Sequence, residues 1–294
     1  MQFWQSVHGV EPEQVIEIAR FAEELGYSGI TFGDHLVKPA TYGDSYIYSE
    51  DGRPPWDPKE LDDWTPPYGD AWVLSAVLAQ ATRRIRFMPY VYVLPLRDPV
   101  MVAKQLATAA FFSDNRVILG VGAGWLPEEF ELVSADWRTR GRRMDEMLEI
   151  IALLLQGRDV EFHGKYYDIP PSRMRPVPTQ PVLVMVGGHS DAALQRAARS
   201  DGWLGMDYEI DELERLLKKL EAYRVGLGTQ DEPFEIFAVL KQFPDLRTLE
   251  RMSAAGVTMT QDYAWFYKGE PYSSLEHKRE TMERFAQSTI STFI

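Results

Sequence analysis

Two adjacent residues, Asp34 and His35, place a carboxylate beside an imidazole directly after a short apolar run that ends at Phe32. Histidine gains and loses a proton near neutral pH, and a neighbouring carboxylate can fix the orientation of its ring. The pair is therefore a candidate for acid–base catalysis, in which His35 exchanges the proton and Asp34 orients it. A polar cap at the end of a strand would give the same dipeptide.

A second feature is the run from Val117 to Glu129, V-I-L-G-V-G-A-G-W-L-P-E-E, in which an apolar strand leads into a glycine-rich, acidic turn. Gly120, Gly122 and Gly124 remove side chains at alternate positions, which permits a tight turn or the close approach of a ligand to the backbone. We expect a planar or phosphorylated group at this strand end. The alternative interpretation is an ordinary turn that connects a strand to a helix and binds no ligand.

A third segment carries Gly187 and Gly188 after an apolar run that ends at Val186, and Ser190 then begins a helical pattern. Backbone N–H groups at such a junction can hold a phosphate. Simple capping of the helix by Ser190 explains the same residues.

Composition limits the class of protein. The chain has 294 residues, 45% of them hydrophobic, a net charge of −13 and no cysteine. The negative charge argues against a nucleic-acid or anionic-membrane partner, and the lack of cysteine excludes thiolate chemistry and disulfides. The five histidines show no paired metal-ligand spacing, and no secretory or membrane-length apolar segment is present. We expect a cytoplasmic protein with a small-molecule substrate and no metal.

Strand-type and helix-type periodicities alternate along the whole chain. The predicted strands span 3–7, 28–32, 85–91, 117–121, 181–186, 202–206, 234–240 and 256–260. The predicted helices span 11–25, 72–82, 99–112, 142–155, 190–199, 207–224, 245–255 and 275–288. Eight strand–helix pairs in a chain of this length predict an α/β fold, a single (β/α)8 barrel domain over 1–294. An open doubly wound sheet is the alternative.

Two segments are longer than ordinary barrel loops. Residues 37–68 contain the aromatic residues Tyr42, Tyr46, Tyr48, Trp56, Trp64 and Tyr68, and residues 163–180 are rich in proline. The aromatic-rich loop follows the second strand, so it can roof a planar or apolar substrate at the mouth of the barrel. A surface flap or a subunit contact is equally compatible with it. We expect the proline-rich segment to be an extended excursion over the mouth.

Together these motifs resemble the bacterial luciferase-like flavin and deazaflavin oxidoreductases, from the first strand to about Met206. The segments that carry the resemblance are Gly33–His35, Arg97–Pro99, Ala103–Gln105, Asn115–Glu129, Arg140–Met144, Gly187–Gly188 and Asp201–Trp203. Within that family, the G-V-G-x-G-W turn and the R-G-R-R run are more similar to the coenzyme F420 branch than to the light-emitting or alkanesulfonate branches.

The resemblance implies a (β/α)8 barrel that binds F420, or alternatively FMN, at the mouth formed by the carboxyl ends of the strands. It places Asp34 and His35 near the ring, and Tyr90 and Val91 where family members often carry a non-prolyl cis peptide that supports the ring. It further assigns Ala123, Gly124 and Trp125 to the side of the ring, and Val186, Gly187, Gly188, His189 and Ser190 to the phosphate.

The activity that follows from the resemblance is hydride transfer between F420 and a small, planar or apolar organic substrate. Trp125 stands where sugar-phosphate dehydrogenases of the group have an acid, which argues against a sugar phosphate. The alternative is an FMN-dependent monooxygenase that uses O2 and a partner reductase, and a further one is a non-catalytic flavin- or deazaflavin-binding protein. Because family members associate and the outer helix faces are apolar, we also expect a homo-oligomer, a dimer.

Overall fold

The chain folds into a closed parallel barrel. The computed structural model describes residues 1–37, 39, 46, 67–262 and 273–293. Its main sheet has the strand order β3-β2-β1-β11-β10-β9-β8-β5-β4, and all of the paired strands in it are parallel. The strands are β1 (Gln2–Ser6), β2 (Gly29–Phe32), β3 (Arg86–Pro89), β4 (Tyr92–Val93), β5 (Leu119–Gly122), β8 (Val184–Gly187), β9 (Gly202–Tyr208), β10 (Glu235–Leu240) and β11 (Met259–Asp262).

Hydrogen bonds between β3 and the residues just before β5 close the sheet. Phe87 donates to the carbonyl of Arg116 at 2.8 Å, and its own carbonyl accepts from Ile118 at 2.9 Å. The short β4 continues β3 beyond Tyr90–Val91, so these two strands together occupy one position in the barrel. The nine strands therefore fill eight strand positions. The predicted (β/α)8 barrel is therefore confirmed, and the open doubly wound sheet is excluded.

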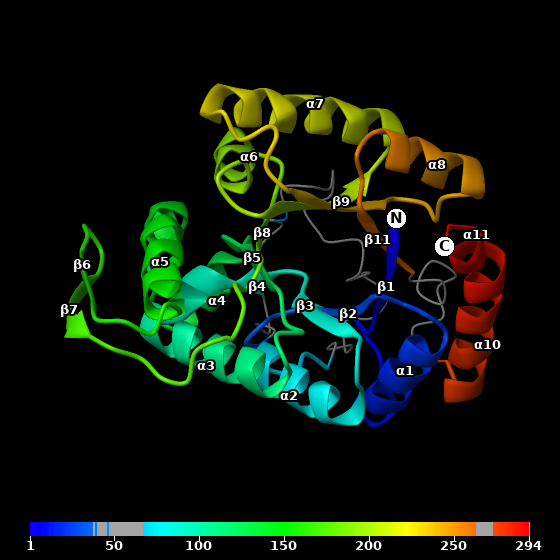
Figure 1. The fold of residues 1–294 in the computed structure, drawn as a ribbon, viewed down its shortest axis with the longest axis horizontal. Coiled ribbons are helices and arrows are strands. Elements are labelled where there is room, and N and C mark those ends of the chain that lie inside the picture. Colours follow the sequence, from blue (N-terminus) through cyan, green and yellow to red (C-terminus); the bar gives the residue numbers. More distant parts are fainter. Residues whose placement is uncertain (38, 40–45, 47–66, 263–272, 294) are drawn as a thin grey trace.

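Helices surround the barrel on its outer side (Figure 1). They are α1 (Pro12–Glu24), α2 (Ala71–Ala81), α3 (Pro99–Phe112), α4 (Pro127–Leu132), α5 (Arg140–Leu154), α6 (Asp191–Ala197), α7 (Ile210–Leu227), α8 (Leu246–Ala254), α10 (Leu275–Phe285) and α11 (Ser291–Phe293). Proline at the first helical position, as in α1 and α3, has a fixed φ that suits a helix start. Alternation of buried strands and amphipathic helices is thus what the periodicities predicted.

Large side chains fill the interior of the barrel below its mouth. Trp4, Met88, Met185, Phe237 and Met259 form a buried cluster there, distinct from the core between strands and helices. A β-carbon added at Gly29 would lie 2.1 Å from the Trp4 ring, so the second strand needs a glycine at this point. The packed interior leaves the carboxyl-end mouth as the place for a site.

The proline-rich segment does not cross the mouth. It begins with an antiparallel hairpin of β6 (Val160–His163) and β7 (Asp168–Ser172), which lies beside α5 (Figure 1). Glu146 of α5 accepts backbone hydrogen bonds from Tyr166 and Tyr167, and Lys104 of α3 binds the carbonyl of Arg175. The expected excursion over the mouth is therefore wrong. Two prolines in β7 hid this strand from the periodicity, and they are tolerated because β7 pairs on one side only.

Two other local predictions differ from the structure. Strand β9 continues to Tyr208, and Asp207 within it has a left-handed φ of 71°, so α7 begins three residues later than expected. The short helix α4 and a 3-10 turn at Trp137–Thr139 occupy the connection between β5 and α5. No helix in the described ranges is both long enough and apolar enough to cross a membrane.

Candidate functional site

A cavity of about 460 Å³ opens at the carboxyl ends of the strands. Of the predicted site residues, Asp34, His35, Tyr90, Val91, Ala123, Gly124, Trp125, Gly187, Gly188, His189 and Ser190 all line it. Val186 does not, because its side chain is buried in the core behind the last residue of β8. A volume of this size is typical of pockets for cofactors and small molecules.

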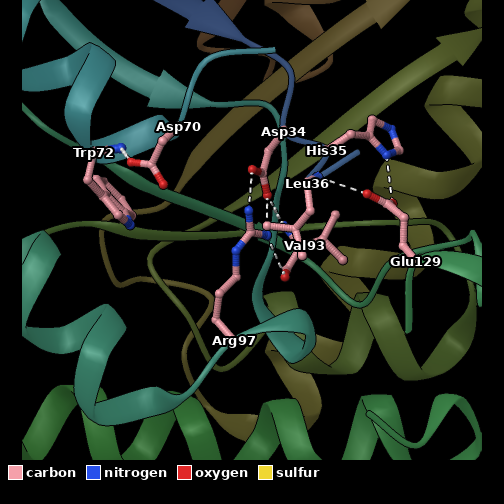
Figure 2. Close-up of polar contacts among 8 residues, drawn as sticks. All are labelled: Asp34, His35, Leu36, Asp70, Trp72, Val93, Arg97 and Glu129. Atoms are coloured by element: carbon pink, nitrogen blue, oxygen red, sulfur yellow. Dashed lines mark hydrogen bonds and ion pairs between the residues drawn. The ribbon is translucent and has the colours of Figure 1, made fainter. Parts of the chain in front are cut away.

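Asp34 is engaged in a buried ion pair (Figure 2). Its two carboxylate oxygens each accept a hydrogen bond of 2.6 Å from the Arg97 guanidinium, and one also accepts from the Val93 N–H at 2.8 Å. Burial raises the pKa of Asp34 in spite of Arg97, whereas at Arg97 the adjoining carboxylate outweighs burial and the pKa of the guanidinium is raised. The two contacts of 2.6 Å favour the ionised pair. The prediction that Asp34 orients His35 is therefore wrong, since this carboxylate is bound to Arg97 and to the backbone of Val93 in β4.

Glu129 is the carboxylate that contacts His35 (Figure 2). Its Oε2 lies 2.7 Å from His35 Nδ1, and its Oε1 accepts the Leu36 N–H at 2.8 Å. Glu129 lies in the first turn of α4, and its side chain is almost fully buried. With Nδ1 held by a carboxylate, Nε2 is the ring nitrogen left for a group in the cavity that His35 lines.

Aromatic side chains form one wall of the cavity. The His35 ring lies 4.9 Å from the Tyr68 ring and 5.9 Å from the Trp125 ring, measured between centroids. Tyr46 meets Trp125 edge to face at 5.2 Å. Of the aromatic loop that was expected to roof the site, Tyr46 and Tyr68 are described and both line the cavity; Tyr42, Tyr48, Trp56 and Trp64 lie outside the described residues.

A glycine-lined slot lies around Val91. The Tyr90–Val91 peptide is cis, as expected at this position. A β-carbon on Gly122 would lie 2.5 Å from Val91 Cγ2, and one on Gly187 would lie 2.8 Å from Val91 Cγ1. The ends of β5 and β8 therefore present backbone to the cavity, and any side chain at either glycine would collide with Val91.

The end of the cavity near α5 and α6 is polar. Arg140 and Arg196 line it together with Gly188, His189 and Ser190. Arg196 is held by Asp145, with its Nε 2.7 Å from the carboxylate, and Arg140 lies 3.5 Å over the Trp137 ring. The Ser190 hydroxyl accepts the Ala193 N–H at 3.3 Å, so capping of α6 by Ser190 is confirmed.

Two further histidines line the cavity, and burial makes both of them harder to protonate. Burial, with a smaller contribution from His35, lowers the pKa of His8 to about 3. Burial likewise lowers the pKa of His189, whose Nδ1 lies 3.3 Å from the Tyr208 hydroxyl. His8 is therefore neutral at physiological pH, and the wall that it shares with Tyr68 carries no charge from it.

Several site residues were not singled out from the sequence. Arg97 and Glu129 stood inside motifs that carried the family resemblance, but nothing in their spacing assigned their partners. His8 and Tyr208 were detectable in principle, since each follows or ends a strand and strand ends meet at the mouth. Arg140 and Arg196 reach the cavity from helices, where periodicity alone predicts only an exposed or a buried face.

Comparison with known proteins shows what the chain is similar to. The family model described as luciferase-like monooxygenase matches residues 2–241. An uncharacterized protein of Mycobacterium tuberculosis is 38% identical over 278 residues, which cover 94% of each chain. The F420-dependent glucose-6-phosphate dehydrogenase of Amycolatopsis mediterranei is 28% identical over 236 residues, 76% of this chain and 64% of that one. The coenzyme F420-dependent tetrahydromethanopterin reductase of Methanopyrus kandleri shares the fold, with a TM-score of 0.76 and 14% identity over 100% of this chain and 99% of its own.

Proposed function

The chain belongs to the luciferase-like monooxygenase family, and from that premise we propose that it is an oxidoreductase that transfers a hydride between coenzyme F420 and a small, uncharged organic molecule. The observation that carries the proposal is a cavity at the strand ends whose lining combines glycine backbone around Val91 with the His35 imidazole and aromatic rings. The relatives whose names include F420 support this cofactor over FMN.

The slot suits a planar ring. Gly122, Ala123 and Gly187 contribute little or no side chain, and Val91 projects between the ends of β5 and β8. A fused ring could therefore contact backbone on one face, as glycine-lined sites allow. The fit extends to the polar end, where the Arg140 guanidinium could bind a phosphate through its fixed fork of donors, beside Arg196, whose charge is balanced by Asp145.

Bound F420 would supply the ring carbon that accepts or gives the hydride, and the residues of the chain would supply positioning and proton exchange. His35 is the group placed to give a proton to the substrate or take one from it. The walls also limit the substrate. His8 is neutral, the charge of Asp34 is compensated by Arg97, and Tyr46, Tyr68 and Trp125 are apolar over most of their surface. These features support a neutral, planar substrate over a sugar phosphate.

The FMN-dependent alternative rests on the monooxygenases for which the family is named. It would require reduced flavin from a partner reductase, and the substrate would be oxygenated by O2. The two proposals therefore differ in oxygen consumption and in the cofactor that binds.

Anaerobic titration of the purified protein with F420 and, separately, with FMN tests the proposal, with ring fluorescence as the readout. We expect saturable, tight binding of F420 and weak binding of FMN. Preference for FMN, together with oxygen consumption in the presence of a flavin reductase, would favour the monooxygenase. Binding of neither cofactor would contradict both and favour a non-catalytic protein.

A further inference from the structure

We infer that Glu129 is a positioning residue that fixes the tautomer of His35, so that neutral His35 carries its hydrogen on Nδ1 and offers Nε2 to the cavity as a proton acceptor. The inference rests on the proposed function only for the step in which a substrate proton reaches Nε2. The tautomer itself is a property of the protein without any cofactor.

The hydrogen bonds of Glu129 carry the inference. A carboxylate can only accept, and Glu129 Oε2 lies 2.7 Å from His35 Nδ1, so the hydrogen of a neutral ring must lie on Nδ1. The other oxygen, Oε1, accepts the Leu36 N–H at 2.8 Å, which prevents the carboxylate from turning away. The side chain is 2% exposed, so water offers little competition for either contact.

The arrangement also assigns separate tasks to the two carboxylates that lie near His35. Asp34 is the immediate neighbour in the chain, yet Arg97 and Val93 occupy its oxygens. Glu129 arrives from α4, 94 positions away in the sequence, and holds both the ring of His35 and the backbone that follows it. One carboxylate thus stabilises the strand end, and the other selects the nitrogen that faces a ligand.

Glu129→Gln gives a sharp test because the amide has one accepting oxygen and one donating nitrogen. The Leu36 N–H can only donate, so it should keep the amide oxygen. The amide NH2 then faces Nδ1 and can be satisfied only if the hydrogen moves to Nε2. We therefore expect the substitution to reverse the tautomer of His35 while the shape of the site is retained.

Nitrogen-15 NMR of the full-length protein labelled at histidine measures the tautomer directly at mildly alkaline pH. His35→Asn identifies the His35 signals among those of the five histidines. We expect the Nδ1–H form in the wild type, the Nε2–H form in Glu129→Gln, and the wild-type form in Glu131→Gln, an exposed position of the same helix. An Nε2–H form in the wild type, or an unchanged tautomer in Glu129→Gln, would overturn the inference.

Kinetics then separates positioning from general structural support. In Glu129→Gln we expect kcat to fall about 10²- to 10⁴-fold, because a ring that carries its hydrogen on Nε2 cannot accept a proton there, with KM and cofactor affinity nearly unchanged. A parallel loss of cofactor affinity and thermal stability would point to a structural role and contradict the inference. If no cofactor binds at all, the NMR result still decides the tautomer, so failure of the proposed function is distinguishable from failure of this inference.

Discussion

The Asp34 carboxylate and the Arg97 guanidinium face each other through two hydrogen bonds of 2.6 Å, and this pair ties the end of β2 to the segment that leads into α3. Arg97 also lies 4.2 Å over the Tyr92 ring. The Val93 N–H, beyond the cis Tyr90–Val91 peptide, completes the partners of Asp34. The segment between β3 and β4, which lines the slot, is therefore held by a buried charge at the end of the neighbouring strand β2.

Arg97→Gln should strongly destabilise the protein. Removal of one partner of a buried ion pair leaves the other charge uncompensated, which typically costs about 3 to 5 kcal/mol. Denaturant unfolding followed by circular dichroism measures the loss. Arg20→Gln is the matched control, because its pair with Glu17 is exposed and such pairs contribute at most about 1 kcal/mol. Equal losses of unfolding free energy in the two variants would show that the Asp34–Arg97 pair contributes no more to stability than an exposed ion pair.

Gly122→Ala should weaken cofactor binding. The new β-carbon would lie 2.5 Å from Val91 Cγ2, so Val91, which lines the slot, must shift. Overpacking of this kind costs about 1 to 3 kcal/mol, which corresponds to a loss of F420 affinity of about 5- to 150-fold if the strain falls on the bound state. Fluorescence titration measures it.

Gly226→Ala is the control for that substitution. A β-carbon at Gly226 in α7 meets nothing within 4 Å, so alanine should stabilise the helix by about 0.5 to 1 kcal/mol and leave binding unchanged. Unaltered F420 affinity in Gly122→Ala would show that the slot is not part of the cofactor-binding site.

His35→Ala should separate binding from turnover. We expect cofactor affinity to be retained and kcat to fall about 10²- to 10⁴-fold, because acid–base groups contribute amounts of this order. Steady-state kinetics with any substrate identified for the enzyme measures the loss. Turnover at the wild-type rate would exclude His35 as the proton-exchanging group, whatever its tautomer.

The fold was largely predictable from local patterns, whereas the pairing within the site was not. Each barrel strand is short, apolar and followed by an amphipathic helix, so periodicity alone indicates eight repeats and places residues such as His35 and Gly187 at the mouth. The partners of those residues depend on tilt and side-chain direction. His35 pairs with a carboxylate 94 positions away instead of the adjacent Asp34, and Asp34 pairs with an arginine 63 positions away.

The errors outside the site have equally local causes. Pro170 and Pro171 interrupt the alternation of β7, so its hairpin with β6 was interpreted as an extended excursion. Asp207 adopts a left-handed conformation that aspartate tolerates better than most residues, and β9 therefore continues past the point where a helix was expected. Neither feature has a signal in hydrophobic periodicity.

Stability should fall with acid in part because of His8. Its folded pKa of about 3 lies below the ordinary 6.5, so the unfolded chain binds more protons between these two values. The contribution of neutral His8 to the free energy of unfolding is fully present above pH 6.5 and is lost as the pH falls toward about 3. In His8→Gln, the slope of the unfolding free energy against pH in this window should decrease by up to about 1.4 kcal/mol per pH unit. An unchanged slope in urea titrations over this range would contradict the assignment.

The outer faces of α2 and α3 should form the contact between two copies of the chain. Val73, Met101 and Phe112 are 64%, 58% and 65% exposed, and Lys104 is the single charged side chain among the exposed positions of these two helices. Because each chain carries a net charge of −13, two copies can approach with least repulsion where charge is scarce, and a two-fold dimer needs one self-complementary face. We expect sedimentation to show a dimer in the wild type and a monomer in Phe112→Glu. Val225→Glu, at a 56% exposed position of the charge-rich α7, should remain dimeric. A monomeric wild type, or equal effects of the two substitutions, would refute this interface.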